Sequence, residues 1–256
     1  MPFATCKLSV IPVRKEAKDS SEQTTQLLFG ETVEILEEIN NWCKIKTLYE
    51  EYQGWIDKRQ VETTSQTPQK QHPDQKETFC GENFGTLSNQ TYKLFIPFGS
   101  ILQLDKHKIA QWSAEKWKYQ GKILQTRAFN EENTIQLAKK FINVPYLWGG
   151  KSIFGIDCSG FTQTIYRLMG IKLLRDSYQQ AQQGTTIDQT KDAKTGDLAF
   201  FQNNNGKIIH VGILLSPTEI IHASSKVRID PFDPKGIFNT DTKTYSHELK
   251  TIKRMV

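Results

Sequence analysis

The second half of the chain contains one cysteine placed where it could act as a nucleophile. Cys158 follows Asp157 in the run DCSGF, at the predicted start of a helix. The unpaired amides and the positive dipole end of a helix N-terminus stabilise an anion. We therefore expect a lowered pKa for the Cys158 thiol, a reactive thiolate, and a backbone amide that faces a developing oxyanion.

Two histidines stand in neighbouring predicted strands, His210 in KIIHVGILL and His222 in EIIHAS. A hairpin centred near Ser216 would place them opposite each other, with Cβ atoms ~4.5–5.5 Å apart. Their rings could then hydrogen-bond, so that His222 fixes the tautomer of the base His210. One cysteine and two histidines could also ligate zinc, and each alone could be structural. The three patterns together favour nucleophilic catalysis.

The elements around these residues predict an α+β domain over residues 129–256. Asn130 is a candidate N-cap of a first helix, and the loop PYLWGGKSIFGID leads to the helix of Cys158, which stops at Gly170. Strands are predicted over 197–201, 207–215 and 219–223. Helices followed by an antiparallel sheet are typical of this fold class.

The first half of the chain consists of short β-rich runs separated by turn signals. Runs within residues 1–62 predict one small barrel with a hairpin turn over 38–41, and runs within 78–128 predict a second barrel. Strands of the second are expected over 92–96, 100–104, 111–119 and 122–125. Residues 63–77, TTSQTPQKQHPDQKE, lack apolar periodicity and predict a linker.

Bulk composition argues against several classes of protein. The 256 residues carry 33 basic and 28 acidic side chains, which are interspersed, so the net charge of +5 gives no reason to expect a nucleic-acid partner. No segment approaches the ~18 apolar residues that span a bilayer. We see no secretory leader and no CxxC pair among the four cysteines, and this predicts a cytoplasmic protein.

The motifs YLWGG, DCSGF, GDLAFF, HVGI and IHAS, in this order, resemble the NlpC/P60 cysteine peptidases, which have a papain-like fold and cleave cell-wall peptides. The resemblance covers about residues 130–256. It implies that Cys158, His210 and His222 form the catalytic triad and that Tyr146 lines the oxyanion region. His107 and His247 match no motif and are expected to be surface or structural residues.

The first half resembles bacterial SH3 domains in the runs SEQTTQLLFGE and YQGWI. Their fusion to this peptidase resembles the γ-D-glutamyl-L-diamino-acid endopeptidases of the dipeptidyl-peptidase VI type. These cut free murein tri- and tetrapeptides, L-Ala-γ-D-Glu-diamino acid, after D-Glu. The expected fold is therefore α+β, a papain-like NlpC/P60 domain preceded by two small SH3-like β-barrels. No metal or organic cofactor is implied, and we expect a monomer.

The resemblance also implies residues that bind the substrate. A free amine near the scissile bond requires a charged partner. The residues expected to hold the amine are Glu22, Tyr52, Asp176 and Ser177, with Glu51 as an alternative to Glu22. The residues expected around the D-Glu are Trp148 and Asp157 in the pocket wall and Ser159 on the carboxylate. Their ordinary roles would be a solvated loop carboxylate for Glu22, a packing aromatic for Tyr52 and a helix N-cap for Asp176.

Three other functions compete with this hypothesis. A secreted hydrolase that cuts polymeric peptidoglycan, with the SH3 domains gripping the wall, predicts a signal peptide and lysis of intact sacculi. A binding protein with a dead peptidase domain predicts a missing triad member, whereas all three are present. An acyltransferase would need an acyl-donor site, for which the sequence offers no signal.

Overall fold

The computed structural model describes residues 2–64, 77–112 and 115–256. The chain divides into two compact units. The first unit is Met1–Thr126 with Lys151–Ile153, and the second unit is Arg127–Gly150 with Phe154–Val256. Across the described residues, no helix combines the length and the apolar character that crossing a membrane requires.

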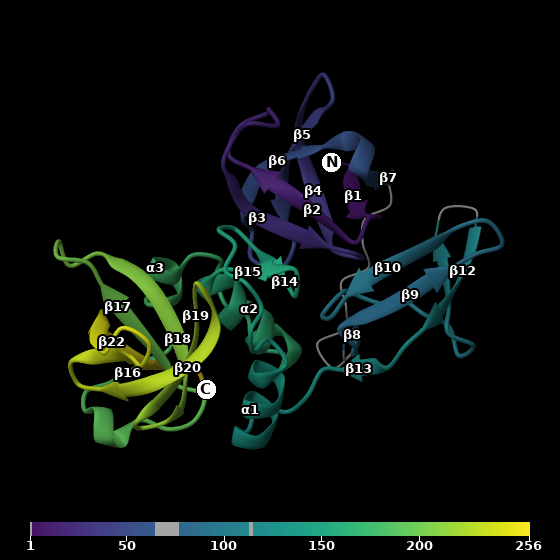
Figure 1. The fold of residues 1–256 in the computed structure, drawn as a ribbon. Coiled ribbons are helices and arrows are strands. Elements are labelled where there is room, and N and C mark those ends of the chain that lie inside the picture. Colours follow the sequence, from purple (N-terminus) through teal and green to yellow (C-terminus); the bar gives the residue numbers. More distant parts are fainter. Residues whose placement is uncertain (1, 65–76, 113–114) are drawn as a thin grey trace. The chain divides into compact units, whose positions relative to one another are not determined.

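The first unit begins with a seven-stranded sheet in the order β3-β2-β6-β5-β4-β1-β7, drawn in purple and blue in Figure 1. Buried positions alternate with more exposed ones along β1, β2, β5 and β6, and the buried residues of the sheet form an apolar core that includes Ile11, Val33 and Ile45. The elements are β1 (Phe3–Cys6), β2 (Val10–Arg14), β3 (Gln23–Leu28), β4 (Thr32–Ile39), β5 (Trp42–Thr47), β6 (Gln53–Asp57), a 3₁₀ turn (Lys58–Gln60) and β7 (Val61–Thr64).

Two sequence predictions in this part need correction. The turn expected over 38–41 is shorter, because Ile39 pairs with Trp42, and the turn residue Asn40 adopts a left-handed φ of 54°. The linker expected over 63–77 begins later, because Thr63 and Thr64 still belong to β7. The greater part of that predicted linker, residues 65–76, lies outside the described residues.

The second module of the first unit is a four-stranded sheet in the order β10-β9-β12-β11 and a separate pair, β13-β8. Tyr119, Leu87 and Ile96 pack in its core together with Phe29. The strand expected over 100–104 is wrong, because Ile101 makes only an isolated bridge to Phe79. The strands are β8 (Thr78–Cys80), β9 (Phe84–Ser88), β10 (Lys93–Pro97), β11 (Ile109–Trp112), β12 (Glu115–Gln120) and β13 (Ile123–Gln125). β14 (Lys151–Ser152) also belongs to this unit.

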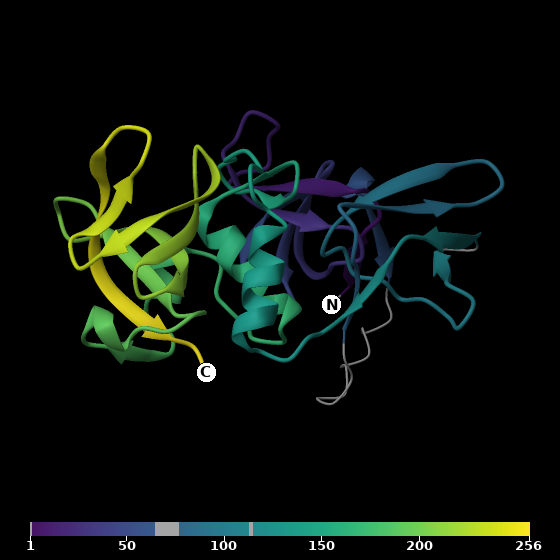
Figure 2. The same ribbon diagram turned by 60° about the horizontal axis from the view of Figure 1, so that its bottom comes forward.

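The helices of the second unit begin where polar N-caps predict. Asn130 accepts a hydrogen bond from the Asn133 amide, and Asp157 accepts one from the Gly160 amide. The second of these helices packs on β18 and β19, and both helices lie beside the large sheet of the second unit in Figures 1 and 2. The elements are α1 (Glu131–Lys139), β15 (Gly155–Ile156), α2 (Cys158–Leu168) and α3 (Ser177–Gln180).

The rest of the second unit is a sheet in the order β16-β22-β17-β18-β19-β20-β21, which closes because β21 also pairs with β22. Phe201, Leu214, Ile220 and Phe232 are buried within it. Helices followed by this antiparallel sheet confirm the α+β arrangement expected for 129–256. The elements are β16 (Thr185–Ile187), a 3₁₀ turn (Thr190–Asp192), β17 (Leu198–Gln202), β18 (Ile208–Ser216), β19 (Glu219–Ser224), β20 (Lys226–Asp233), β21 (Gly236–Asn239) and β22 (Thr244–Arg254).

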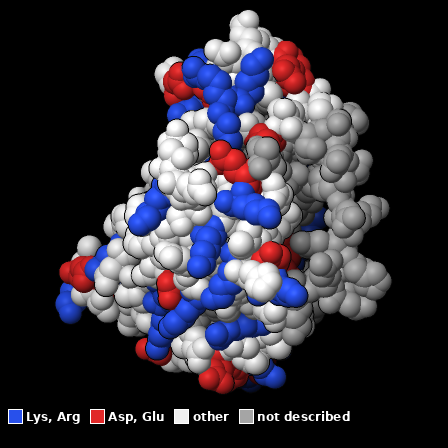
Figure 3. All heavy atoms as spheres, turned by 90° about the vertical axis from the view of Figure 1, so that its right-hand side faces the viewer, with Lys and Arg blue, Asp and Glu red and all other residues white. Residues whose placement is uncertain are grey.

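The charged side chains on the face in Figure 3 are of both signs, with Lys and Arg spread among Asp and Glu. This agrees with the interspersed charges of the sequence. A mixed surface of this kind gives no specific indication of a polyanionic partner.

Candidate active site

Cys158 is the first residue of α2, which confirms the helix start predicted at the DCSGF motif. The residue is almost fully buried. Its sulfur accepts hydrogen bonds from the backbone amides of Ser159 and Val211. Val211 follows His210 directly on β18. The nucleophile candidate therefore lies against the strand that carries the base candidate.

The N-cap carboxylate of Asp157 fixes the start of this helix. Its two oxygens accept hydrogen bonds from the amides of Gly149 at 2.8 Å and Gly160 at 2.6 Å. The buried guanidinium of Arg175 pairs with the same carboxylate, at 2.6 Å from Nη2 to Oδ2. A Cβ at Gly160 would lie 2.3 Å from the carbonyl oxygen of Gly150, so glycine is required for this close approach.

These contacts give Asp157 and Ser159 structural roles, and the substrate contacts expected of both stay predictions. The Asp157 carboxylate is 6% exposed and committed to internal partners. The Ser159 hydroxyl accepts a hydrogen bond from Arg175 Nη1 at 2.9 Å. Both side chains hold the nucleophile loop together through their hydrogen bonds to Arg175. Arg175 was missed by the sequence analysis, although it precedes Asp176 in the run RDS.

The two histidines meet, but not by the predicted register. His222 pairs with Gly212, because the β18–β19 ladder shifts between Leu214 and Ser216. A Cβ at position 212 would lie 2.9 Å from the Cβ of His222, so Gly212 makes room for that histidine. Nε2 of His210 still lies 2.9 Å from Nδ1 of His222, which confirms the predicted hydrogen bond between the rings.

Asp230 on β20 extends this pair and was not foreseen. Its Oδ2 lies 3.0 Å from Nε2 of His222, and Arg228 Nη2 and Thr240 Oγ1 donate to its Oδ1. Burial alone would raise the pKa of Asp230, but the hydrogen bonds from His222 and Arg228 hold it at about 2. The carboxylate is therefore ionised at neutral pH and accepts a hydrogen bond from Nε2–H of His222.

The Asp230 carboxylate determines which ring nitrogen carries the proton in His222 and, through it, in His210. Burial lowers the pKa of His222, and burial followed by the neighbouring His247 and His222 lowers the pKa of His210 well below its ordinary value. Both rings are then neutral near pH 7. With its proton on Nε2, His222 accepts through Nδ1, and His210 must donate through its own Nε2. Nδ1 of His210 is left unprotonated, as a general base requires.

The resting thiol differs from the predicted one. Burial, followed by the Asp157 carboxylate, raises the pKa of Cys158 to about 12, against the weaker effects of the Val211 and Ser159 amides and Arg175. The expected lowering by the helix N-terminus is therefore wrong for the buried resting state. A nucleophile in this state needs a neighbouring base to take its proton.

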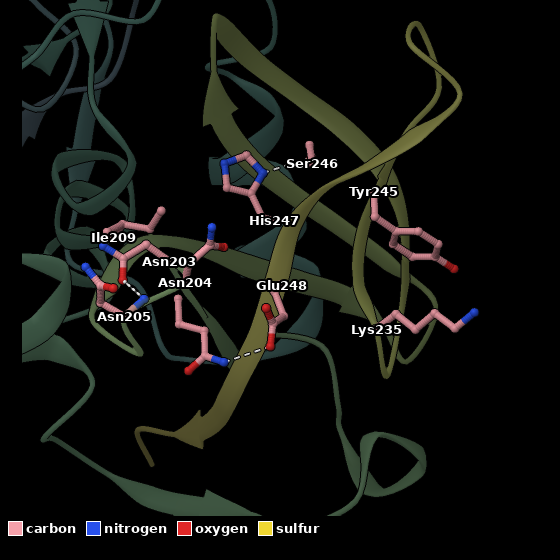
Figure 4. Close-up of a pocket in the computed structure, with 10 residues that line it drawn as sticks. Asn203, Asn204, Asn205, Ile209, Lys235, Tyr245, Ser246, His247 and Glu248 are labelled. Atoms are coloured by element: carbon pink, nitrogen blue, oxygen red, sulfur yellow. Dashed lines mark hydrogen bonds between the residues drawn. The ribbon is translucent and has the colours of Figure 1, made fainter.

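His247, expected to be a surface or structural residue, is half-buried and lies against the base candidate His210. Its ring stacks on that of His210, with centroids 4.1 Å apart and planes inclined by 25°. It also lines an open hollow of about 720 Å³ with Ile209, Glu248 and the turn residues Asn203–Asn205 (Figure 4). Burial and the neighbouring His222 lower the pKa of His247 to about 4. His107, in contrast, is exposed, as predicted.

Tyr146 and Trp148 precede the nucleophile on the same loop. Tyr146 is half-buried, and burial, followed by the nearby Cys158 and Asp157, raises the pKa of its phenol. Its hydroxyl therefore stays protonated near the nucleophile and is able to donate a hydrogen bond. Trp148 is 62% exposed.

Asp176 and Ser177 begin α3, which is tied to the helix of the nucleophile. Asp176 is the N-cap, and its amide donates to Gln179 Oε1. The buried Gln180 donates from Nε2 to the Ser159 carbonyl at 3.0 Å. The structure thus brings the RDS run next to the first turn of α2, and Asp176 also fills its ordinary role as a cap.

Glu22 and Tyr52 lie in the first unit. The Glu22 carboxylate is 3.7 Å from Lys15 Nζ and 44% exposed, and the Tyr52 amide donates to Thr47 Oγ1 at 3.0 Å. Glu51 has a left-handed φ of 62° in the same turn. Their proposed role in reading an amine stays a prediction.

A cysteine at a helix start, beside two neighbouring strands that carry a carboxylate-supported histidine pair, is the arrangement used by thiol hydrolases. Residues 143–246 match the NlpC/P60 family, and residues 13–61 match the bacterial dipeptidyl-peptidase SH3 domain.

Similar proteins align with most of the chain. A γ-D-glutamyl-L-lysine dipeptidyl-peptidase of Bacillus subtilis is 30% identical over 217 residues, which cover 78% of this chain and 71% of the relative. A protein of the same name from Bacillus cereus is 28% identical over 252 residues, covering 85% and 73%. The crystal structure of an NlpC/P60 family protein from Bacillus cereus has the same fold, with a TM-score of 0.80 at 21% identity over 99% of both chains. The chain belongs to the NlpC/P60 family and is a peptidase with a bacterial SH3 domain.

Proposed function

We propose that this chain is a cysteine endopeptidase that hydrolyses the γ-D-glutamyl–diamino acid bond of free murein peptides with an N-terminal L-Ala. The observation that supports this chemistry is the hydrogen-bonded series Asp230–His222–His210. It ends next to Val211, whose backbone amide hydrogen-bonds to the Cys158 sulfur. The bond is suggested by the two Bacillus relatives, which are named for γ-D-glutamyl-L-lysine.

The proposed reaction is acyl transfer through a thioester on Cys158, in a papain-like arrangement. Nδ1 of His210 takes the thiol proton as the sulfur attacks the γ-carbonyl of D-Glu. The Cys158 amide and the Tyr146 hydroxyl donate to the oxyanion, and removal of one such donor typically costs about 10²–10³ in rate. His210 then gives the proton to the leaving amine, and water, deprotonated by the same ring, hydrolyses the thioester.

Reading of the free L-Ala amine is proposed for Asp176 and Ser177 together with Glu22 and Tyr52. A charged carboxylate is the partner that a buried ammonium requires. Glu22→Ala should lower kcat/KM on a free tripeptide much more than on its acetylated form. An equal, small loss on both substrates would show that Glu22 does not read the amine.

The decisive experiment is mass spectrometry of products from L-Ala-γ-D-Glu-L-Lys and from the same peptide with its amine blocked, each repeated with diaminopimelate. Release of L-Ala-D-Glu from the free peptides alone supports the proposal. Equal cleavage of the blocked peptides, with lysis of intact sacculi, would instead support the secreted wall hydrolase. Cys158→Ala should fold normally and have background activity.

The proposal includes a cellular role. A peptidase limited to free peptides would recycle murein fragments in the cytoplasm, as a monomer. On this proposal the first SH3-like module serves substrate selection, and the second module, also proposed to be SH3-like, has no assigned task.

A further inference from the structure

Three imidazoles from three strands of the second unit converge at one point. One ring nitrogen from each of His210 on β18, His222 on β19 and His247 on β22 lies within 4.8 Å of the other two. Only the first two have a role in the proposed reaction. His247 is therefore an additional potential metal ligand next to His210, the general base of the proposed reaction.

The spacing of these nitrogens is near that of a tetrahedral metal site. At ~2.0–2.1 Å from zinc, neighbouring ligand nitrogens lie roughly 3.3 Å apart. The hydrogen-bonded nitrogens of His210 and His222 are at 2.9 Å, so they need to separate only slightly. The ring centroids of His222 lie 5.1 Å from His210 and 5.8 Å from His247, whereas the stacked rings of His210 and His247, 4.1 Å apart, have to open before both can bind one ion.

The surroundings of the rings also suit a metal. Nε2 of His222 is hydrogen-bonded to the Asp230 carboxylate, which is the usual outer partner of a metal-ligating histidine. Ser246 Oγ lies 2.8 Å from Nδ1 of His247, which leaves Nε2 of that ring for a metal. Figure 4 shows His247 on the wall of the open hollow, so this ring is accessible to an ion and a water ligand, whereas His210 and His222 are buried.

We propose that His210, His222 and His247 bind one zinc-like divalent cation, which reversibly inhibits the peptidase. The cation takes the place of the proton that Nε2 of His210 shares with Nδ1 of His222, and this proton moves to Nδ1 of His210, so that the ring binds the cation as a neutral imidazole. His210 is then a metal ligand and cannot act as the base. Inhibition rests on the proposed function, whereas binding of the cation does not.

The test is a zinc titration of the metal-free full chain against a chromophoric chelator, with cobalt absorption spectra to identify the ligands. We expect one equivalent of zinc, bound at least tenfold more weakly by His247→Gln and His247→Ala. The exposed-histidine variant His107→Ala is the matched control and should bind like the wild type. Cys158→Ala should also bind normally, and the cobalt spectrum should lack thiolate charge-transfer absorption. Circular dichroism checks that each variant is folded.

Several results would overturn the site. These are no zinc binding by the folded wild type, unchanged binding by both His247 variants, or loss of binding in Cys158→Ala. The last would assign the metal to the thiol. Inhibition is measured separately, as the ratio of tripeptide hydrolysis with and without zinc, and should be reversed by a chelator. A protein that binds zinc through His247 but never hydrolyses the tripeptide would refute the proposed function and leave the metal site standing.

Discussion

Asp230→Asn is the substitution that tests the histidine chain most directly. Each carboxylate oxygen of Asp230 faces donors, with His222 and Arg228 Nε at Oδ2 and Arg228 Nη2 and Thr240 at Oδ1. An asparagine amide presents one NH₂ group, which must face one of these sets. If it faces His222, Nε2 of that ring has to accept, so its proton moves to Nδ1.

The change of tautomer in His222 then also changes the tautomer of His210. His222 would donate to Nε2 of His210, and the proton of His210 would sit on Nδ1, the nitrogen needed to deprotonate Cys158. Loss of a correctly oriented base costs about 10²–10⁴ in rate, which is the loss expected in kcat/KM. Removal of the anion also lowers the pKa of the imidazoles further. The acidic limb of the pH–rate profile should therefore move to lower pH, which a purely structural role would not cause.

Asp241→Asn is the matched control for this experiment. Asp241 pairs with the same Arg228 at 2.6 Å, but its side chain is 71% exposed, and no hydrogen bond joins it to His222 among those the structure describes. It should leave the pH profile unchanged and alter stability by no more than about 1 kcal/mol. A folded Asp230→Asn enzyme with nearly full activity and an unshifted acidic limb would refute the proposed proton path.

Further outcomes follow from the buried charges and the thiol. Arg175→Met leaves the Asp157 carboxylate buried without its guanidinium, so urea unfolding should show a loss of about 3–5 kcal/mol, and a loss below about 1 kcal/mol would contradict the buried pair. Because the pKa of Asp230 is lowered from 3.8 to about 2, its stabilisation is complete above about pH 4 and is lost as the pH falls toward 2, on the order of 2 kcal/mol. Urea midpoints of the wild type and Asp230→Asn should thus converge in acid, and parallel curves would disprove this. Since burial raises the pKa of Cys158, its alkylation, followed by peptide mapping, should accelerate about tenfold per pH unit above neutrality; a plateau near pH 7 would reveal a preformed thiolate.

Local signals in the sequence were sufficient to place the nucleophile and the elements around it. Asn130 and Asp157 cap the helices they were predicted to cap, and Cys158 is the first residue of its helix. These features depend on a few neighbouring residues, which the sequence displays directly. The hydrogen bond between His210 and His222 was also predictable, because it joins adjacent strands of one hairpin.

The missing parts of the site depend on long-range pairing or on burial. His247 reaches His210 only because β22 pairs with β17 and β21, and Asp230 reaches His222 because β20 follows on β19. Neither residue stands in a motif. The hairpin register differed because a shift near Ser216 is invisible in an alternating pattern. The thiol pKa was mistaken because the helix-terminus effect was considered without the opposing cost of burial.

The short segment Lys151–Ile153 limits how freely this architecture can be recombined. These residues belong to the first unit, although the sequence on both sides of them belongs to the second. Within the first unit, the nearly buried Lys151 ammonium lies 3.1 Å from Glu31, and its amide donates to Gln26. A fragment starting at Arg127 would keep this lysine and lose both partners. Exchanging the SH3 domain for an unrelated one would thus remove both partners of a lysine that stands only a few residues before the nucleophile.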